Sequence, residues 1–276
     1  MKIMKLLKRD IALGTARNWF KFLVVVLVVI VYSHFLALMI ASGVDSGSFY
    51  SNGTVMDYLL YITQGMEVFH FSPEEYFSIP IYWFVFQIGI SYMIAYYPEK
   101  DFKNFGKKIF LSSGSRVNWW ISKCLWGVLN VILYFAVLIL ATMGIAKFHG
   151  AEMTWTFSEE IMTGFFGSNM QYINMQDAWL ISIILPCLMT IALSLLQILL
   201  SFLLTPVVSF AMMCGIYIVS AYYTSWILLG NYTMWLRSSY VGMEGINPQS
   251  GILIAVFIIV ASIFAGCVYF DKCDVF

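Results

Sequence analysis

Residues 178–229 form one long apolar run, AWLISIILPCLMTIALSLLQILLSFLLTPVVSFAMMCGIYIVSAYYTSWILL, without a single Asp, Glu, Lys or Arg. A helix needs about 20 apolar residues to cross a membrane, because about 30 Å of hydrocarbon is covered at about 1.5 Å per residue. The run is too long for one crossing. Thr205-Pro206 divides it, because proline suits the first position of a helix and disfavours helix in the residue before it. We predict two spanning helices, 178–204 and 206–229, joined by a tight turn.

The composition of the whole chain agrees with a membrane protein. Of its 276 residues, 61% are hydrophobic and 11% are charged, with a mean hydropathy of +0.83. A soluble domain carries about 25% charged residues, so too few charges remain here to cover a surface that faces water. The composition excludes a soluble enzyme, a nucleic-acid-binding protein and a disordered chain. We predict an all-α polytopic membrane protein.

Four further segments are long and apolar enough to cross a membrane, which gives six predicted spans in a single domain, 1–276. These segments are 20–41, 79–97, 119–148 and 251–270. The first is too long for the apolar part of a cleavable signal peptide, so we expect it to remain as a span. The longer connections, 42–78 and 149–177, are predicted extracellular loops.

The basic residues predict the orientation of these spans. With six spans, both termini and the 98–118 connection share one side, and of the 15 Lys and Arg only Lys147 and Arg237 fall on the other. The acids divide the other way, because only five of the 15 lie with the termini: Asp10, Glu99, Asp101, Asp271 and Asp274. Cytoplasmic loops are enriched in Lys and Arg. We therefore expect both termini in the cytoplasm and the protein in the plasma membrane.

Few polar side chains lie deep in the predicted spans. The candidates for a transport path are His34, Gln87, Asn130, Thr190, Ser194 and Gln197. The last three share one face of the fourth span. Either they form hydrogen bonds between helices, or they line a mildly polar wall of a transport path. Because no Asp, Glu, Lys or Arg lies near a midplane, ion-coupled transport is disfavoured. His34 is either a helix-to-helix hydrogen-bonding residue or a proton relay.

Residues 1–19 predict an amphipathic helix lying in the membrane interface. One helical stripe is apolar and the opposite face is basic: Ile3, Met4, Leu7, Ile11 and Gly14 on the stripe, Lys2, Lys5 and Arg9 opposite. The alternative is a disordered basic tail that serves only the topology.

The connection after the second span, 98–116, has an aromatic face that a simple loop does not need. The apolar positions of one short helical face are Phe102, Phe105, Ile109 and Phe110, and the basic side chains around them are Lys103, Lys107 and Lys108. Such a face needs a partner, either the membrane surface or a protein groove that accepts a helix.

The layout resembles the ABC-2-type membrane subunit of ABC transporters. The run from Leu111 to Lys123, LSSGSRVNWWISK, resembles that family's stretch in which an Arg and then a Lys lead into the third span. The resemblance implies that 102–111 is the coupling helix that docks in a groove of the ATPase subunit. It implies that Arg116 and Lys123 lie at the cytoplasmic end of span three. Among ABC-2 proteins the chain resembles small bacterial permeases linked to export of, or immunity to, amphipathic peptides.

No sequence in the chain predicts an enzyme or a cofactor site. A phosphate-binding loop needs GxxxxGK[ST], which does not occur, so ATP and Mg²⁺ are expected on a separate subunit. The five cysteines lie in or beside apolar runs at spacings that match neither a zinc site nor a disulfide framework.

We therefore expect the permease subunit of an ATP-driven exporter for amphipathic peptides or other hydrophobic substrates. Its partners are two ATPase subunits, a second permease subunit, identical or homologous, and the lipid bilayer. One rival is an ion-coupled secondary carrier or channel, for which His34 is the candidate residue. The other is a non-transporting immunity protein that binds a peptide on the acidic, aromatic outer loops. The direction of transport stays open.

Overall fold

The structure is a computed structural model of the chain, and it describes residues 2–71, 76–106, 116–167 and 173–272. Its longest helices are α2 (Phe22–Asp45), α7 (Arg116–Phe148), α10 (Leu185–Leu203), α11 (Pro206–Tyr222) and α12 (Pro248–Lys272). Within the described residues no strand forms, and only the isolated bridges Thr54–Glu152 and Ser238–Ile246 occur. The predicted all-helical fold class is therefore confirmed.

Several of the remaining helices are short or have non-α geometry. They are α1 (Lys2–Asp10), η1 (Ile11–Thr15), η2 (Ala16–Lys21), α3 (Val55–Thr63), α4 (Ile81–Ala95), α5 (Tyr97–Asp101), η3 (Phe102–Gly106), α8 (Glu159–Phe166), α9 (Met175–Trp179), η5 (Leu180–Ile184), η6 (Leu229–Thr233) and η7 (Trp235–Arg237). Segments η1, η3 and η5 are π-helical, and η2, η6 and η7 are 3₁₀-helical.

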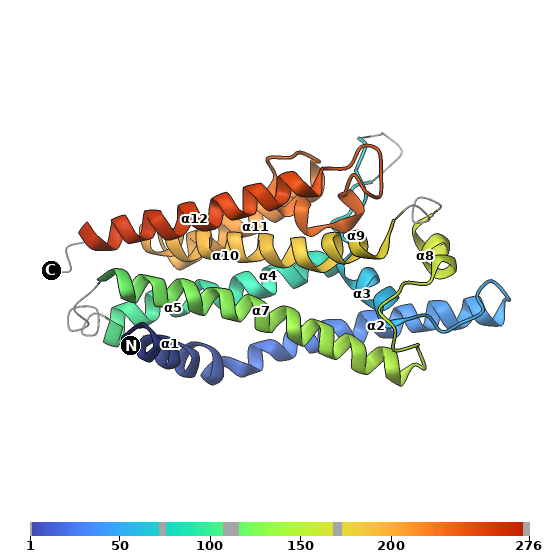
Figure 1. Cartoon of the computed structure of the whole chain (residues 1–276), viewed down its shortest axis with the longest axis horizontal. Coiled ribbons are helices and arrows are strands. Elements are labelled where there is room, and N and C mark those ends of the chain that lie inside the picture. Colours follow the sequence, from blue (N-terminus) through green and yellow to red (C-terminus); the bar gives the residue numbers. More distant parts are fainter. Residues whose placement is uncertain (1, 72–75, 107–115, 168–172, 273–276) are drawn as a thin grey trace.

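The long helices run side by side (Figure 1). Helices α2 and α7 run in the same direction, and α4, which lies between them in the sequence, runs the opposite way. Helix α10 returns the chain again, α11 reverses it, and α12 ends at the same end of the bundle at which α1 begins. We call this end the terminus end, and the opposite end, with α3, α8 and η6, the cap end.

Four helical segments in the described part of the chain are long and apolar enough to cross a membrane. They are Trp19–Asp45, Arg116–Phe148, Met175–Leu203 and Pro248–Lys272. They correspond to four of the predicted spans, and they support a membrane protein. Helix α4, with 15 residues, and α11, with 17, are shorter than the helices predicted there.

The turn predicted at Thr205-Pro206 is confirmed. Thr205 is extended (φ −148°, ψ 158°) and its hydroxyl accepts a hydrogen bond from the amide of Val208, which caps α11. The predicted extension of this helix to residue 229 is wrong, because α11 ends at Tyr222. The helix ends here because Arg237, in the segment that follows, donates hydrogen bonds to the carbonyls of Ser220 and Ala221 in the last turn of α11.

Pro186 lies two residues after the end of a π-helical turn, η5, in the fourth span. Helix α9, η5 and α10 are continuous from Met175 to Leu203, and Pro186 is at the start of α10. A proline has no amide hydrogen to donate to the preceding turn, and a π-turn is one of the ways in which a helix absorbs that loss. Pro186 thus distorts the helix locally without ending it.

The two longer predicted loops pack on each other at the cap end. The amide of Val55 donates to the carbonyl of Glu152 (3.1 Å), and the amide of Glu152 donates to that of Gly53 (2.8 Å). Buried residues from both loops form one apolar cluster with α2; Leu59, Ile161 and Met162 belong to it. A separate larger cluster, with Trp119, Trp126 and Ile198, occupies the bundle toward the terminus end.

Candidate functional site

Four charged side chains from three separate elements meet at the terminus end. The ammonium group of Lys123 on α7 lies 2.5 Å from Oδ1 of Asp10 on α1 and 2.7 Å from Oδ2 of Asp101 on α5. Arg9, next to Asp10 on α1, forms an ion pair with Asp101. Lys123 is 0% exposed, Asp10 1% and Asp101 7%. We call these four residues the ionic cluster.

Neutral groups complete the coordination of Asp10. The hydroxyl of Tyr97 donates to Oδ1 (2.9 Å) and that of Ser122 donates to Oδ2 (2.7 Å). The ammonium of Lys123 also lies 4.8 Å from the centre of the Tyr97 ring. Two acids balance two bases, and a buried charge is tolerated only when it is paired and hydrogen-bonded. The ionic cluster therefore fixes α1 and α5 to α7.

The sequence brings α1 to this position by a change of helical geometry. Leu7 packs against the core and Gly14 is buried, as the predicted apolar stripe requires, but Met4 is 62% exposed and Ile11 37%. The predicted stripe is therefore only partly buried, and a π-helical turn from Ile11 to Thr15 follows α1 directly. Residues Lys2–Asp10 are α-helical; an amphipathic helix over 1–19 that lies in the membrane interface stays a prediction.

Gly14 permits close approach of the N-terminal helix to α7 and α5. A Cβ atom at this position would lie 2.6 Å from Nε1 of Trp126 and 2.8 Å from the Tyr97 ring. Directly beside it, Thr15 accepts a hydrogen bond from Nε1 of Trp126 (3.1 Å) and donates to Oδ1 of Asn130 (3.0 Å). The N-terminal segment therefore contacts α7 at two places, through the ionic cluster and, further along, through Gly14 and Thr15.

The segment predicted to be a coupling helix begins with an internal anchor. The Phe102 ring lies 5.3 Å from that of Trp119 on α7, 5.9 Å from that of Phe202 on α10 and 6.3 Å from that of Phe270 on α12, between ring centres. Phe102 therefore faces the bundle rather than a partner. Aromatic pairs at these separations contribute about 0.5–1.5 kcal/mol each beyond the area they bury.

The other residues predicted for coupling are only partly described. Lys103 is exposed and pairs with Glu99 (2.6 Å) one helical turn earlier. Arg116 starts α7 and donates to the carbonyl of Asp271 (3.1 Å) at the end of α12. The side chain of Phe105 and residues Lys107, Lys108, Ile109 and Phe110 lie outside the described residues. A docking role for this segment stays a prediction.

The residues predicted for a transport path are separated into three groups. Thr190 donates to Oε1 of Gln87 (3.3 Å), and Nε2 of Gln197 donates to the carbonyl of Ser91 (3.0 Å), both between α10 and α4. Ser194 lies between them on the same buried face of α10. Asn130 faces Thr15 on the N-terminal helix, and its Nδ2 donates to the carbonyl of Trp126 (2.7 Å). His34 lies near the cap end and pairs with His149.

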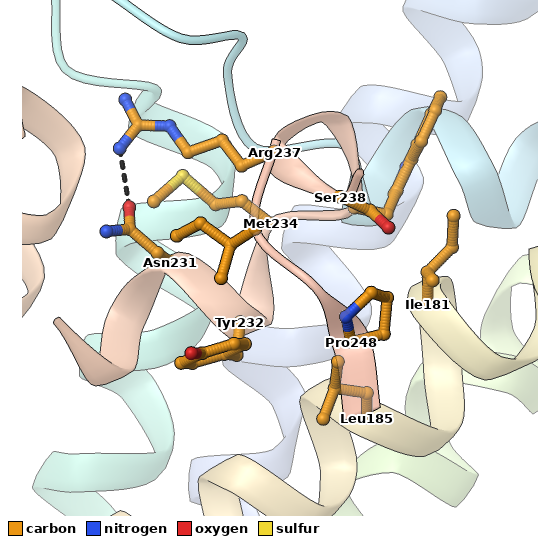
Figure 2. Close-up of a pocket in the computed structure, with 10 residues that line it drawn as sticks. Ile181, Leu185, Asn231, Tyr232, Met234, Arg237, Ser238 and Pro248 are labelled. Atoms are coloured by element: carbon orange, nitrogen blue, oxygen red, sulfur yellow. Dashed lines mark hydrogen bonds between the residues drawn. The ribbon is translucent and has the colours of Figure 1, made fainter. Parts of the chain in front are cut away.

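A second buried cation, Arg237, holds the cap end together. Its guanidinium donates to the carbonyls of Ser220 and Ala221 (2.5 Å to the latter) at the end of α11 and to Oδ1 of Asn231 (2.5 Å), as Figure 2 shows for Asn231. It also reaches the carbonyl of Glu67 (3.3 Å). Burial lowers the pKa of Arg237 to about 10, so the group remains charged at neutral pH.

These contacts explain why α11 stops early. The carbonyls at a helix end carry partial negative charge and need donors, and Arg237 provides several donors from one planar group. The recess beside it is lined in part by Ile181, Leu185, Tyr232 and Pro248, and its cavity volume is only about 10 Å³. Ligand pockets usually have about 300–1,000 Å³, so we assign no ligand to this recess.

Sequence reasoning missed the two carboxylates of the ionic cluster. It counted Asp10 and Asp101 only as cytoplasmic acids, and it predicted Arg9 on the face of α1 away from the apolar stripe. A usable signal was present, because Asp10 lies on the same helical face as Leu7 and Gly14. An acid on the packing face of a basic helix indicates a buried partner of opposite charge.

No protein-family model, curated protein or solved structure matches the chain. The local resemblance of 111–123 to the ABC-2 family therefore remains the basis of a proposal, and the function has to be argued from the arrangement of the residues themselves.

Proposed function

We propose that the chain is the permease subunit of an ATP-driven exporter of the ABC-2 type, with six spans and both termini in the cytoplasm of a bacterial cell. The course of the chain supports this number. Helix α2 ends at the cap end and α7 begins at the terminus end, so α4 and α5 must carry the chain across the bundle (Figure 1). By the same reasoning α11 must cross between α10 and α12.

The single observation that carries the proposal is the ionic cluster together with the Phe102 anchor. They attach the 98–106 segment to α1, α7, α10 and α12 at one end of the bundle. A displacement of this segment therefore moves several long helices rather than a loose loop. This is the mechanical property that a permease needs if ATP binding on a separate subunit is to change the arrangement of its spans.

The deep polar residues favour a substrate that is itself apolar. Thr190 donates to Oε1 of Gln87, and Gln197 and Asn130 donate to backbone carbonyls. These groups leave little hydrogen-bonding capacity for an ion or a sugar. We propose amphipathic peptides or other hydrophobic molecules that leave from the bilayer, moved by a pair of permease subunits, identical or homologous, with two ATPase subunits.

The test is a mild-detergent purification of the tagged chain from its native membrane. We expect a polypeptide with a Walker A sequence to copurify, identified by mass spectrometry, and the eluate to hydrolyse ATP. Phe105→Asp places a charge on the predicted docking face, so this variant should lose the ATPase subunit. Tyr50→Asp is the matched control, because Tyr50 is 90% exposed in the 46–53 connection after α2, far from the terminus end.

The outcomes separate the parts of the proposal. Loss of the ATPase with Phe105→Asp and retention with Tyr50→Asp would support the docking segment. Equal recovery with both variants would preserve the family and reject this docking segment. Folded wild-type protein that copurifies with no nucleotide-binding chain would contradict the proposed function.

A further inference from the structure

Two lysines from separate elements lie near each other at the terminus end without an acidic partner. Lys21 is the last residue of η2, at the start of the apolar helical segment Trp19–Asp45, and Lys100 lies on α5. Their positive charges are close enough to repel each other. Within the described residues neither lysine forms an ion pair. Like charges at close range destabilise each other, so the folded chain leaves a pair of positive charges unbalanced here.

The acids of the surrounding elements already have partners of their own. Glu99, directly before Lys100, pairs with Lys103 (2.6 Å), and Asp101, directly after it, belongs to the ionic cluster. Asp10 is the only acid among the first 44 residues, and it belongs to the same cluster. No acid of the N-terminal segment or of α5 is therefore left to balance the two lysines.

Aromatic rings on α4 adjoin the lysine pair. The ammonium group of Lys21 lies 4.9 Å from the centre of the Tyr92 ring, and the ring centres of Tyr92 and Tyr96 are 5.8 Å apart. Tyr92 is 50% exposed and Tyr96 37%. Tyrosine is enriched where the apolar interior of a membrane meets the headgroups, because its ring is apolar and its hydroxyl is polar. The rings therefore place the lysine pair at the level of the headgroups.

The helix face that continues from Lys21 is open to acyl chains rather than to water. The side chains of Val24 and Leu27 are exposed on α2, within a segment long and apolar enough to cross a membrane. Lysines near the end of such a helix extend their ammonium groups to the interface. A ligand that fits both features has a negative group at the interface and apolar chains along the helix. This is the chemistry of an anionic phospholipid.

We propose that Lys21 and Lys100 bind the phosphate group of an anionic phospholipid whose acyl chains lie against α2. Lysine binds phosphate through charge-assisted hydrogen bonds, and basic pockets between helices at a membrane surface bind anionic headgroups. The phosphate supplies the negative charge that the surrounding elements lack. Phosphatidylcholine carries its own cation, so it balances the pair less well. The bound lipid links η2 to α5, and the site does not depend on the proposed export function.

The experiment measures lipid binding to the full-length detergent-purified protein by native mass spectrometry. Phosphatidylglycerol and phosphatidylcholine with identical acyl chains are added separately, and we expect the wild type to bind phosphatidylglycerol roughly tenfold more tightly. Lys21→Gln and Lys100→Gln should each weaken phosphatidylglycerol binding by roughly fivefold, because each removes one of two attractions to the phosphate. Lys21→Arg should retain the preference, since a guanidinium also binds phosphate.

Lys8→Gln is the matched control for a diffuse attraction between the lipid and the basic terminus end. Lys8 is exposed on α1, and its replacement removes the same charge, but this variant should bind phosphatidylglycerol as the wild type does. Without lipid, the melting temperatures of Lys21→Gln and Lys100→Gln should equal or exceed that of the wild type, because each substitution removes a repulsion. Phosphatidylglycerol should raise the melting temperature of the wild type more than theirs.

A soluble competitor distinguishes a lipid from a free phosphate compound. Glycerol 3-phosphate has the phosphate without the acyl chains, and an excess of it should leave lipid binding unchanged. Full displacement of the lipid would assign the pair to a soluble phosphate and overturn the proposal. Equal binding of both lipids to the wild type would also overturn it. So would an equal loss in Lys8→Gln, which would indicate that the lipid is attracted by the general basic charge.

Discussion

Lys123 shows how one residue depends on the charges around it. Its ammonium group is fully buried, and it is held by carboxylates from two other elements, Asp10 and Asp101. Truncating one member of a buried ion pair leaves an uncompensated charge, at a cost of roughly 3–5 kcal/mol, whereas removing both members is often nearly neutral. The energy of the ionic cluster is therefore a property of the balance of charges, and no single member carries it.

This balance leads to a double-mutant prediction. Lys123→Met leaves Asp10 without a cation, while Asp101 keeps Arg9, so we expect a loss of roughly 3–5 kcal/mol in unfolding free energy. Adding Asp10→Asn to Lys123→Met removes the orphaned charge and should recover most of that loss. The measurement is denaturant unfolding in detergent of the wild type, both single variants and the double variant.

A double variant that is no more stable than Lys123→Met would show that charge balance does not govern this site. The single variant Asp10→Asn completes the cycle and gives the coupling energy between the two side chains. Arg237 differs in this respect, because carbonyl groups and an amide rather than carboxylates surround it.

At the scale of elements, helix ends and irregular turns decide which faces meet. The π-helical turn Ile11–Thr15 places Gly14 against Trp126 and Tyr97. At the other end of the molecule, Thr54 and Asp57 form a capping box that starts α3. Burial raises the pKa of Asp57 to about 6, although hydrogen bonds from Ser158 and Thr54 oppose that shift. The Thr-x-x-Asp pattern was readable from sequence, but the contact between Asp57 and Ser158 was not.

Two glycines allow an element-scale test with an internal control. Gly14→Ala puts a Cβ 2.6 Å from Nε1 of Trp126, so either η1 or the rings of Trp126 and Tyr97 must shift, and we expect a loss of about 1–3 kcal/mol. Gly144→Ala meets no atom within 4 Å and lies inside α7, so the higher helix propensity of alanine should stabilise the protein by about 0.5–1 kcal/mol. Unfolding midpoints in detergent measure both.

Opposite signs for the two substitutions are the expected result. If Gly14→Ala were neutral or stabilising, η1 would not pack against α7 as described. Hydrogen exchange of the amides in α1 provides a local readout, because a displaced α1 should lose protection while α12 keeps it.

At the scale of the whole molecule, the direction of each helix determines the topology. The start of α1 and the end of α12 lie at the terminus end, whereas α3 and α8 lie at the cap end (Figure 1). The ionic cluster joins α1, α5 and α7 at the terminus end, and Arg237 binds the chain after α3. Most Lys and Arg residues belong to the segments that lie at the terminus end, namely the N-terminal residues and the 98–118 connection. Lys and Arg are enriched on the cytoplasmic side of membrane proteins. The structure and the charge pattern therefore agree on which loops share a side.

Reporter fusions test this topology. A green fluorescent protein at the C-terminus should fluoresce, because it folds in the bacterial cytoplasm. An alkaline phosphatase domain inserted after Gly47 should be active, because that position belongs to the cap end and has open space around it. Exchanging the two reporters should abolish both signals. An active phosphatase at the C-terminus would contradict the proposed orientation.

Much of the fold was predictable because its signals are local. Helix type, the position of the long apolar helices and the Thr205-Pro206 turn follow from neighbouring residues in sequence. The early end of α11 was not predictable, because it depends on Arg237, which binds the carbonyls of Ser220 and Ala221 from a later segment, and on Asn231, which binds that of Tyr223 directly after the helix. The inward orientation of Phe102 likewise depends on rings from three other helices.

By itself, the sequence determined that the chain is helical and suited to a membrane, because apolar run length and charge distribution are properties of contiguous segments. Only the tertiary structure decided that Arg9, Asp10, Asp101 and Lys123 form one buried cluster and that His34 meets His149. The physical reason is the range of the contacts. A buried charge or a paired imidazole acquires its partner from a distant part of the chain, and local periodicity carries no record of that partner.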